Sequence, residues 1–310
     1  MKPRRMNEFE KGKAIEDFAT ILEPGESEPP ILIPAVRQSV FQWMTELNCA
    51  EELEAVGIKP RRKLIFFGPP GCGKTTLAHH LSARMGVPLI LVNMQTVVSC
   101  YLGQTGNNID AIFKDLAAQE NDCVLFLDEF DSIAEKRATT DQGSLRERNA
   151  IVVALLQKMD AYAGTMIAAT NRSDDIDAAI WRRFEMHIEI GLPDAECRFA
   201  IIRRYLSPFE IDDDAISAIA SASGGATPAM LRQLSESIKR DIILAPRLRY
   251  DDGAVAILRR AVATTMPHAD SAVPSLWGKP EKTAALLEKH WPPRLSTATT
   301  TTSKEERKED

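Results

Sequence analysis

The sequence has few of the features that mark secreted, disulfide-bonded or membrane proteins. Its five cysteines are scattered over 310 residues, are odd in number and include no C-x-x-C pair. This pattern argues against a disulfide framework or a cysteine metal site. No apolar run approaches the roughly 18 residues that a membrane helix needs, and the polar N-terminus lacks the apolar stretch of a secretory signal. We therefore expect a cytoplasmic protein without a membrane partner.

The charge balance is not basic either. The formal net charge is −6, with 44% hydrophobic and 26% charged residues. These proportions are typical of a soluble globular chain, and the negative sign argues against nucleic acid as a partner. The length allows one large domain or two ordinary ones.

A glycine-rich segment follows the apolar run 63–67 and fits the phosphate-binding pattern G-x-x-x-x-G-K-[ST]. It consists of Gly68, Pro69, Pro70, Gly71, Cys72, Gly73, Lys74 and Thr75. The pattern requires a strand before it and a helix after it, and the residues around it fit both. Converging backbone N–H groups and the helix N-terminus would bind the polyphosphate of ATP. A chance glycine- and proline-rich turn is the weaker alternative.

Two side chains of this loop have expected roles, and a third has an expected property. Lys74 should reach the β- and γ-phosphates, and the Thr75 hydroxyl should ligate Mg²⁺. Thr76 completes the set expected to bind nucleotide. Lys74 and the helix N-terminus should lower the pKa of the Cys72 thiol, which would expose it to oxidation. The plainer interpretation of Cys72 is a small space-filling residue.

Apolar runs alternate with helical patterns through the first two thirds of the chain. Strands are expected at 63–67, 89–92, 123–127, 166–169 and 187–190, and helices at 74–86, 106–119, 144–160 and 175–182. This alternation predicts an α/β fold in which a parallel sheet is flanked by helices. Ligands of such sheets bind at the carboxyl ends of the strands, where the glycine-rich loop lies.

The pattern changes after residue 192. Only helices are expected there, at 194–206, 212–222, 228–244 and 252–264. The predicted organisation is a flexible arm (1–30), an α/β nucleotide-binding domain (31–192), a small all-helical lid (193–268) and a mostly disordered tail (269–310). Residues 283–291 form either a docking helix or part of a weakly ordered tail.

The apolar run 123–127 ends in two acids at the sheet edge that carries the phosphate loop. Asp128 is placed to hold Mg²⁺, and Glu129 to orient and polarise the water that attacks the γ-phosphate. The alternative is a strand with an acidic turn, and the loop upstream disfavours it.

Residues 167–184 include T-N-R-x-D, then D-x-A, then two arginines before Phe184. This segment resembles the second region of homology of the AAA family within the AAA+ ATPases, and the likeness extends over about residues 55–265. The resemblance implies that Asn171 helps to place the lytic water. It also implies that Arg182 and Arg183 are arginine fingers, which project into the nucleotide of a neighbouring subunit. The family spacing is R-x-G-R-F, whereas the two arginines here are adjacent, and alignment with R-F favours Arg183. A salt-bridged surface pair is the alternative.

Two further segments are similar to family elements. Tyr101, Leu102 and Gly103 resemble the aromatic–hydrophobic–glycine pore loop of protein-remodelling rings, although Tyr101 could simply pack beneath a loop. A second pore-facing loop is expected near 136–146. In the lid, the segment around Ala229 loosely resembles the turn that touches adenine.

The resemblance implies a single-module Mg²⁺-ATP hydrolase. It would work as a homo-oligomeric ring, expected to be a hexamer, that remodels or unfolds a protein substrate through a central pore. The alternative is a nucleotide-switched regulator or scaffold that does not thread its partner. Because few residues precede the phosphate loop, we expect a separate adaptor or protease to select or degrade the substrate.

Overall fold

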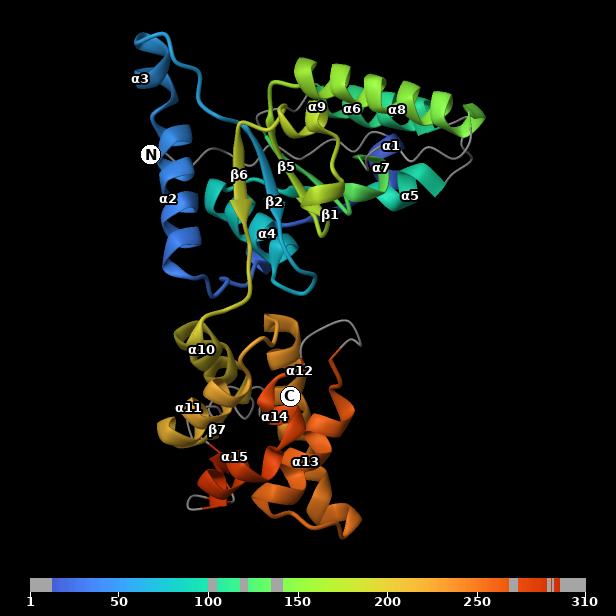
Figure 1. Ribbon diagram of the computed structural model, residues 1–310. Helices are drawn as coiled ribbons and strands as arrows, with labels where there is room; N and C mark the ends of the chain where they lie inside the picture. Colours follow the sequence, from blue (N-terminus) through green and yellow to red (C-terminus); the bar gives the residue numbers. More distant parts are fainter. Residues whose placement is uncertain are drawn as a thin grey trace, which may run out of the picture. The chain divides into compact units, whose positions relative to one another are not determined.

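A computed structural model of the chain describes residues 13–99, 105–117, 122–134, 142–267, 273–288, 291 and 293–295. The chain divides into two units (Figure 1). The core unit comprises Met1–Pro30 and Pro34–Gly191, and the helical unit comprises Ile31–Ile33 and Leu192–Asp310.

The expected parallel sheet is present in the core unit. Its five parallel strands are β2 (Lys63–Phe67), β3 (Leu89–Asn93), β4 (Val124–Asp128), β5 (Thr165–Thr170) and β6 (Met186–Glu189). A sixth strand, β1 (Ala19–Leu22), pairs antiparallel with β3. The strand order is β1-β3-β4-β5-β2-β6, which puts the carboxyl ends of β2, β4 and β5 together at one edge.

Helices cover both faces of this sheet, as the continuous apolar strands require. On one face, alternate strand residues such as Ile65 and Leu125 are buried in a single apolar cluster. That cluster includes residues of α6 (Thr105–Ala117) and α8 (Gln142–Ala161). The intervening residues, such as Phe66, are buried on the opposite face, because side chains alternate along a strand. There α4 (Lys74–Met85) contacts β3, β4 and β5. Short helices of this unit include α3 (Ala50–Ala55), α5 (Met94–Ser99) and α7 (Asp131–Ala134).

The segment expected to be a flexible arm contains ordered elements. Helix α1 (Lys13–Phe18) contacts α6 and leads directly into β1. Ile15 is fully buried in the core cluster, and its N–H donates to Asp115 Oδ2 at 3.4 Å. The apolar residues that make this contact are few and stand among charged ones, so composition alone conceals them.

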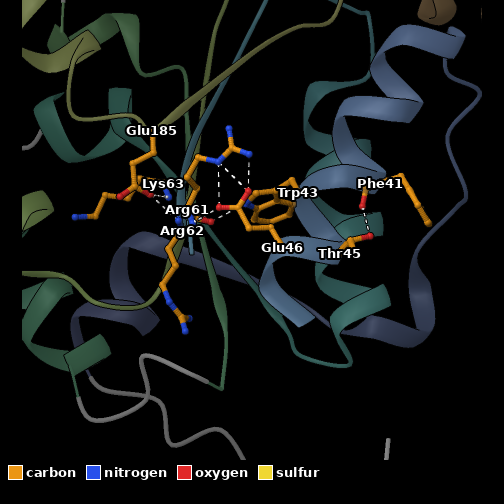
Figure 2. Close-up of polar contacts among 8 residues, drawn as sticks. All are labelled: Phe41, Trp43, Thr45, Glu46, Arg61, Arg62, Lys63 and Glu185. Atoms are coloured by element: carbon orange, nitrogen blue, oxygen red, sulfur yellow. Dashed lines mark hydrogen bonds and ion pairs between the residues drawn. The ribbon is translucent and has the colours of Figure 1, made fainter. Parts of the chain in front are cut away.

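Helix α2 (Pro34–Asn48) lies beside β6 and is attached to the residues that enter β2 (Figures 1 and 2). Trp43 is fully buried, and its Nε1–H donates to the backbone oxygen of Arg61 at 2.9 Å. The Arg61 N–H donates to Glu46 Oε1 at 2.8 Å, and its guanidinium Nε donates to Glu46 Oε2 at 2.9 Å. These contacts fix the start of the strand that ends at the phosphate loop.

A second anchor reaches the same segment from the chain before β6. Glu185 Oε2 accepts hydrogen bonds from the backbone N–H groups of Arg62, at 2.6 Å, and Lys63, at 3.0 Å (Figure 2). The entry into β2 is therefore held from both sides by carboxylates.

The helical unit is built from six helices and a two-residue ladder among its described residues. The helices are α10 (Ala195–Leu206), α11 (Asp213–Ala222), α12 (Pro228–Leu248), α13 (Ala254–Thr264), α14 (Ser275–Gly278) and α15 (Pro280–Leu287). The ladder pairs β7 (Phe209–Glu210) with β8 (Arg294–Leu295) and was not predicted.

Helix α15 lies in the stretch expected to be mostly disordered. Its Ala284 and Leu287 are buried in the apolar core of the helical unit, and Ile31 packs against the same core. In the described part of the chain, no helix is both long enough and apolar enough to cross a membrane.

Candidate active site

The phosphate loop depends on glycines with positive φ. Gly68, Gly71 and Gly73 have φ values of +139°, +75° and +91°, where a side chain would strain the backbone. Residue 68 must be glycine, because a Cβ there would lie 2.3 Å from the backbone oxygen of Ile190. Gly73 is the N-cap of α4, so the loop leads directly into a helix N-terminus.

Lys74 is buried at the centre of this loop, with 7% of its surface exposed. Its ammonium donates to the backbone oxygens of Gly68 at 2.8 Å and Pro69 at 2.9 Å, and to Asn171 Oδ1 at 2.7 Å. Burial lowers the pKa of Lys74, and the charges of nearby groups, Asp128 among them, only partly offset this. All three acceptors are neutral, so a buried cation is surrounded by oxygens that carry no formal charge. A bound polyphosphate would supply the missing negative charge, and the loop therefore fits ATP.

The expected metal ligands lie together. The Thr75 hydroxyl, in the first turn of α4, donates to Asp128 Oδ2 at 3.0 Å. Asp128 ends β4, and its other oxygen accepts the N–H of Glu129 at 2.9 Å. A hydroxyl and a carboxylate from two different elements are ligands that Mg²⁺ accepts, so these residues fit the ion.

Glu129 has an unusual backbone conformation. Its φ is +52°, in the left-handed region that a non-glycine residue rarely adopts. Such conformations cluster at functional sites, because the surrounding structure must hold them. Glu129 directly follows Asp128, the expected metal ligand, and its role in activating water stays a prediction.

Asp131 is a further residue of this site, and no motif in the sequence predicts a role for it. Its Oδ1 accepts from the Thr170 hydroxyl at 3.0 Å and from the backbone N–H of Asn171 at 3.3 Å. Asp131 therefore joins the end of β4 to the end of β5 and holds Asn171 beside Lys74. The only signal in the sequence is the third acid of the run Asp128-Glu129-Phe130-Asp131.

The two adjacent arginines have different environments. The Nε of Arg183 lies 2.8 and 3.1 Å from the two carboxylate oxygens of Asp160, near the end of α8. Arg182 caps the short helix α9 (Ala178–Trp181) and is exposed. Within the residues that the structure describes, its guanidinium forms no ion pair.

The expected lowering of the Cys72 pKa is wrong. Cys72 is 7% exposed, and burial raises the pKa of its thiol, with the charge of Lys74 only partly opposing that effect. A buried thiol with a raised pKa is a poor nucleophile, so the space-filling interpretation is the better one.

Some predicted site residues are not brought together with this cluster. Tyr101, Leu102 and Gly103 lie outside the described residues, as does most of the expected second pore loop. Ala229 is exposed in the first turn of α12 in the helical unit, so its contact with adenine stays a prediction. Thr76 is exposed on α4.

The fold and the site define a P-loop nucleotide-binding domain. A strand leads into a glycine loop with a buried lysine, and the threonine in the first turn of the following helix donates to the aspartate that ends the parallel strand β4. Residues 64–192 match the family described as "ATPase family associated with various cellular activities (AAA)". Residues 64–192 therefore correspond to an AAA-family ATPase domain.

Several curated proteins are similar to this chain. An uncharacterized AAA family ATPase, y4kL, of Sinorhizobium fredii is 39% identical over 63% of this chain and 57% of its own length. The ATPase family gene 2 protein of Saccharomyces cerevisiae is 36% identical over 60% of this chain and 25% of its own length. A proteasome-activating nucleotidase of Pyrococcus horikoshii is 34% identical over 61% of this chain and 49% of its own length. The chain thus spans about half the length of most of the relatives it matches.

Proposed function

We propose that the protein hydrolyses ATP with Mg²⁺ in a homo-oligomeric ring, a hexamer, and uses the energy to remodel or unfold a protein substrate. The observation that carries the proposal is a pair of side-chain hydrogen bonds at the carboxyl edge of the sheet, from Lys74 to Asn171 at 2.7 Å and from Thr75 to Asp128 at 3.0 Å.

In the proposed mechanism, the loop N–H groups and Lys74 bind the β- and γ-phosphates. Thr75 and Asp128 would hold Mg²⁺, which neutralises charge on the phosphates. Glu129 orients the attacking water and accepts its proton. Asn171, held by Asp131, donates from its amide to the γ-phosphate or the water, while its Oδ1 stays on Lys74.

A ring explains why one of the two arginines is exposed. A guanidinium supplied by a neighbouring subunit would neutralise charge on the transferring phosphoryl group and link hydrolysis to assembly. Alignment alone favours Arg183, but that side chain already pairs with Asp160 of its own chain. We therefore assign the trans role to Arg182.

A protein substrate is supported by the relatives. The name of the proteasome-activating nucleotidases says that those proteins activate a proteasome. By analogy, this protein would deliver an unfolded chain to a separate protease or adaptor. Tyr101, Leu102 and Gly103 would grip the substrate in the pore.

The mass of the Glu129→Gln protein, measured at one fixed concentration with and without Mg²⁺-ATP, tests the ring. This variant should bind ATP, hydrolyse it very slowly and form a closed oligomer only with nucleotide. Lys74→Ala, which should not bind ATP, is the matched control and should stay dissociated. A Glu129→Gln monomer under both conditions would contradict the ring and favour a nucleotide switch.

Tyr101→Ala tests threading separately. The variant should retain basal ATP hydrolysis and lose the ability to unfold a tagged protein substrate. If unfolding proceeds at the wild-type rate, the pore assignment fails although the ATPase assignment stands. The protein would then act as a regulator or scaffold.

A further inference from the structure

Trp181 contacts two aromatic residues from different strands. Its ring centroid lies 5.5 Å from that of Phe67, with an edge-to-face angle of 66°. It lies 4.3 Å from the ring of His187 with an angle of 25°, so those two rings are stacked. Both geometries are favourable for aromatic pairs. Trp181 is therefore held between the end of β2 and the middle of β6.

The backbone of Trp181 is held as well as its ring. The Nε2 of His187 lies 3.0 Å from the backbone oxygen of Trp181. A carbonyl oxygen can only accept a hydrogen bond, so Nε2 carries the proton and donates it. One histidine thus fixes both the position of the Trp181 main chain and the plane of its ring.

The stack adjoins two residues of the proposed nucleotide sites in sequence, Gly68 and Arg182. Phe67 is the last residue of β2 and immediately precedes Gly68 of the phosphate loop. Arg182 immediately follows Trp181 and caps α9. Helix α9 has only four residues, too few to be stable alone, so tertiary contacts must decide where its last residues lie.

The residues after Arg182 are anchored too. Arg183 pairs with Asp160 at 2.8 Å. Phe184 is buried against Phe130, with ring centroids 5.6 Å apart. The next residue, Glu185, binds the backbone at the start of β2 (Figure 2). Arg182 thus stands between anchored residues, and within the described chain its guanidinium makes none of these contacts.

We propose that Trp181 is the positioning residue for Arg182, and that its contact with Phe67 couples the phosphate loop of a subunit to the arginine that the subunit offers to its neighbour. This inference rests on the proposed trans role of Arg182. A shift of the loop when nucleotide binds or leaves would move Phe67, and Trp181 would carry that movement to Arg182. The stack would therefore join consecutive sites of the ring through the body of each subunit.

The expected kinetic signature is a loss in kcat rather than in nucleotide affinity. Misplacing a catalytic group by about 1 Å can cost about 100-fold in rate. We expect Trp181→Ala to lower kcat for ATP about 10- to 100-fold, with a nearly unchanged KM and unchanged binding of a fluorescent ADP. Trp181→Phe, which keeps a ring between Phe67 and His187, should restore most of the rate.

Subunit mixing separates a positioning role from damage to the fold. Glu129→Gln subunits should bind ATP and hydrolyse it very slowly, yet they carry an intact Arg182 and Trp181. Adding them in excess to Trp181→Ala subunits should restore hydrolysis at the Trp181→Ala sites, because each such site then receives its arginine from an intact neighbour. Arg182→Ala subunits should be restored in the same way. Trp43→Phe alters a buried tryptophan on α2 and serves as a control. The rate of ATP hydrolysis by Trp43→Phe subunits should not rise when Glu129→Gln subunits are added.

The outcomes distinguish this inference from the proposal beneath it. If mixing restores Arg182→Ala but not Trp181→Ala, Trp181 acts within its own site and the inference is overturned. If mixing restores neither variant, the trans role of Arg182 fails and the inference fails with it. A raised KM together with weaker ADP binding in Trp181→Ala would also overturn it.

Discussion

The close approach of the phosphate loop to the end of β6 makes Gly68 the most demanding position in the site. A Gly68→Ala side chain would lie 2.3 Å from the backbone oxygen of Ile190, about 1 Å inside a normal carbon–oxygen contact. The N–H of Ile190 donates to the backbone oxygen of Phe67 at 2.7 Å, so relieving the clash means separating β2 from β6 at this point. The backbone oxygen of Gly68 also accepts from Lys74.

Two effects contribute to the free-energy cost of Gly68→Ala. A side chain at a backbone conformation reserved for glycine costs about 1–3 kcal/mol. Weakening the neighbouring backbone hydrogen bond adds about 1 kcal/mol. We therefore expect the free energy of unfolding of the core unit to fall by about 2–4 kcal/mol. Affinity for ATP should fall at least about tenfold, because Lys74 loses its fixed position.

Urea unfolding followed by circular dichroism, together with titration of a fluorescent ATP analogue, measures both effects. Two other glycines provide controls. Gly57 has a φ of +81°, and no atom lies within 4 Å of the place that a Cβ would take, so Gly57→Ala should show the backbone strain alone. Gly25 has open space around it and no positive φ, so Gly25→Ala should leave both quantities unchanged. The reasoning is refuted if Gly68→Ala is as stable as Gly57→Ala and binds ATP as tightly as the wild type.

Two further predictions concern charged residues of the core unit. The hydrogen bond from Arg61 holds the pKa of Glu46 below its ordinary value of 4.5, so the stabilisation is present above that value and is lost as the pH falls through the lower, folded-state pKa. Glu46→Gln should therefore lower the free energy of unfolding by about 1 kcal/mol at neutral pH. Thermal unfolding across a pH series should show this difference between variant and wild type shrinking in acid. A difference that stays constant with pH would contradict the role given to the Arg61–Glu46 pair. Arg182→Ala should abolish most ATP turnover in a steady-state ATPase assay. Arg183→Ala and Asp160→Ala should cause smaller losses of similar size, because they remove the same ion pair. If Arg183→Ala is less active than Arg182→Ala, the trans role belongs to Arg183.

The parallel sheet could be predicted because its strands are buried on both faces. Such strands appear in the sequence as continuous apolar runs, and all five predicted runs became strands within one or two residues of their expected bounds. The phosphate loop and the acids at the end of β4 could also be predicted from the sequence, because each is a motif of fixed spacing within a short segment. Asp131, by contrast, acts through the end of another strand, and only the fold shows that Thr170 and Asn171 lie within reach.

The features that could not be predicted depend on contacts between residues distant in sequence. Phe67, Trp181 and His187 look like three unrelated aromatic residues until β6 is placed beside β2. The Cys72 pKa was misjudged because its sign depends on how deeply the loop is buried, which the motif does not encode. The pairing of Arg183 with Asp160 likewise requires α8 to end near α9.

The antiparallel strand β1 has a consequence for how the chain folds and stays dispersed. Its four residues, Ala19–Leu22, pair with Val92 to Leu89 and cover the edge of β3, which would otherwise present unpaired N–H and C=O groups to solvent. Such an edge is a template on which another molecule can add its own strand. During synthesis β1 leaves the ribosome about 70 residues before its partner and cannot pair until β3 follows. Strand β1 then forms the edge of the sheet itself, and because a short edge strand is a poor template for another molecule, it protects the sheet against aggregation once β3 has been made.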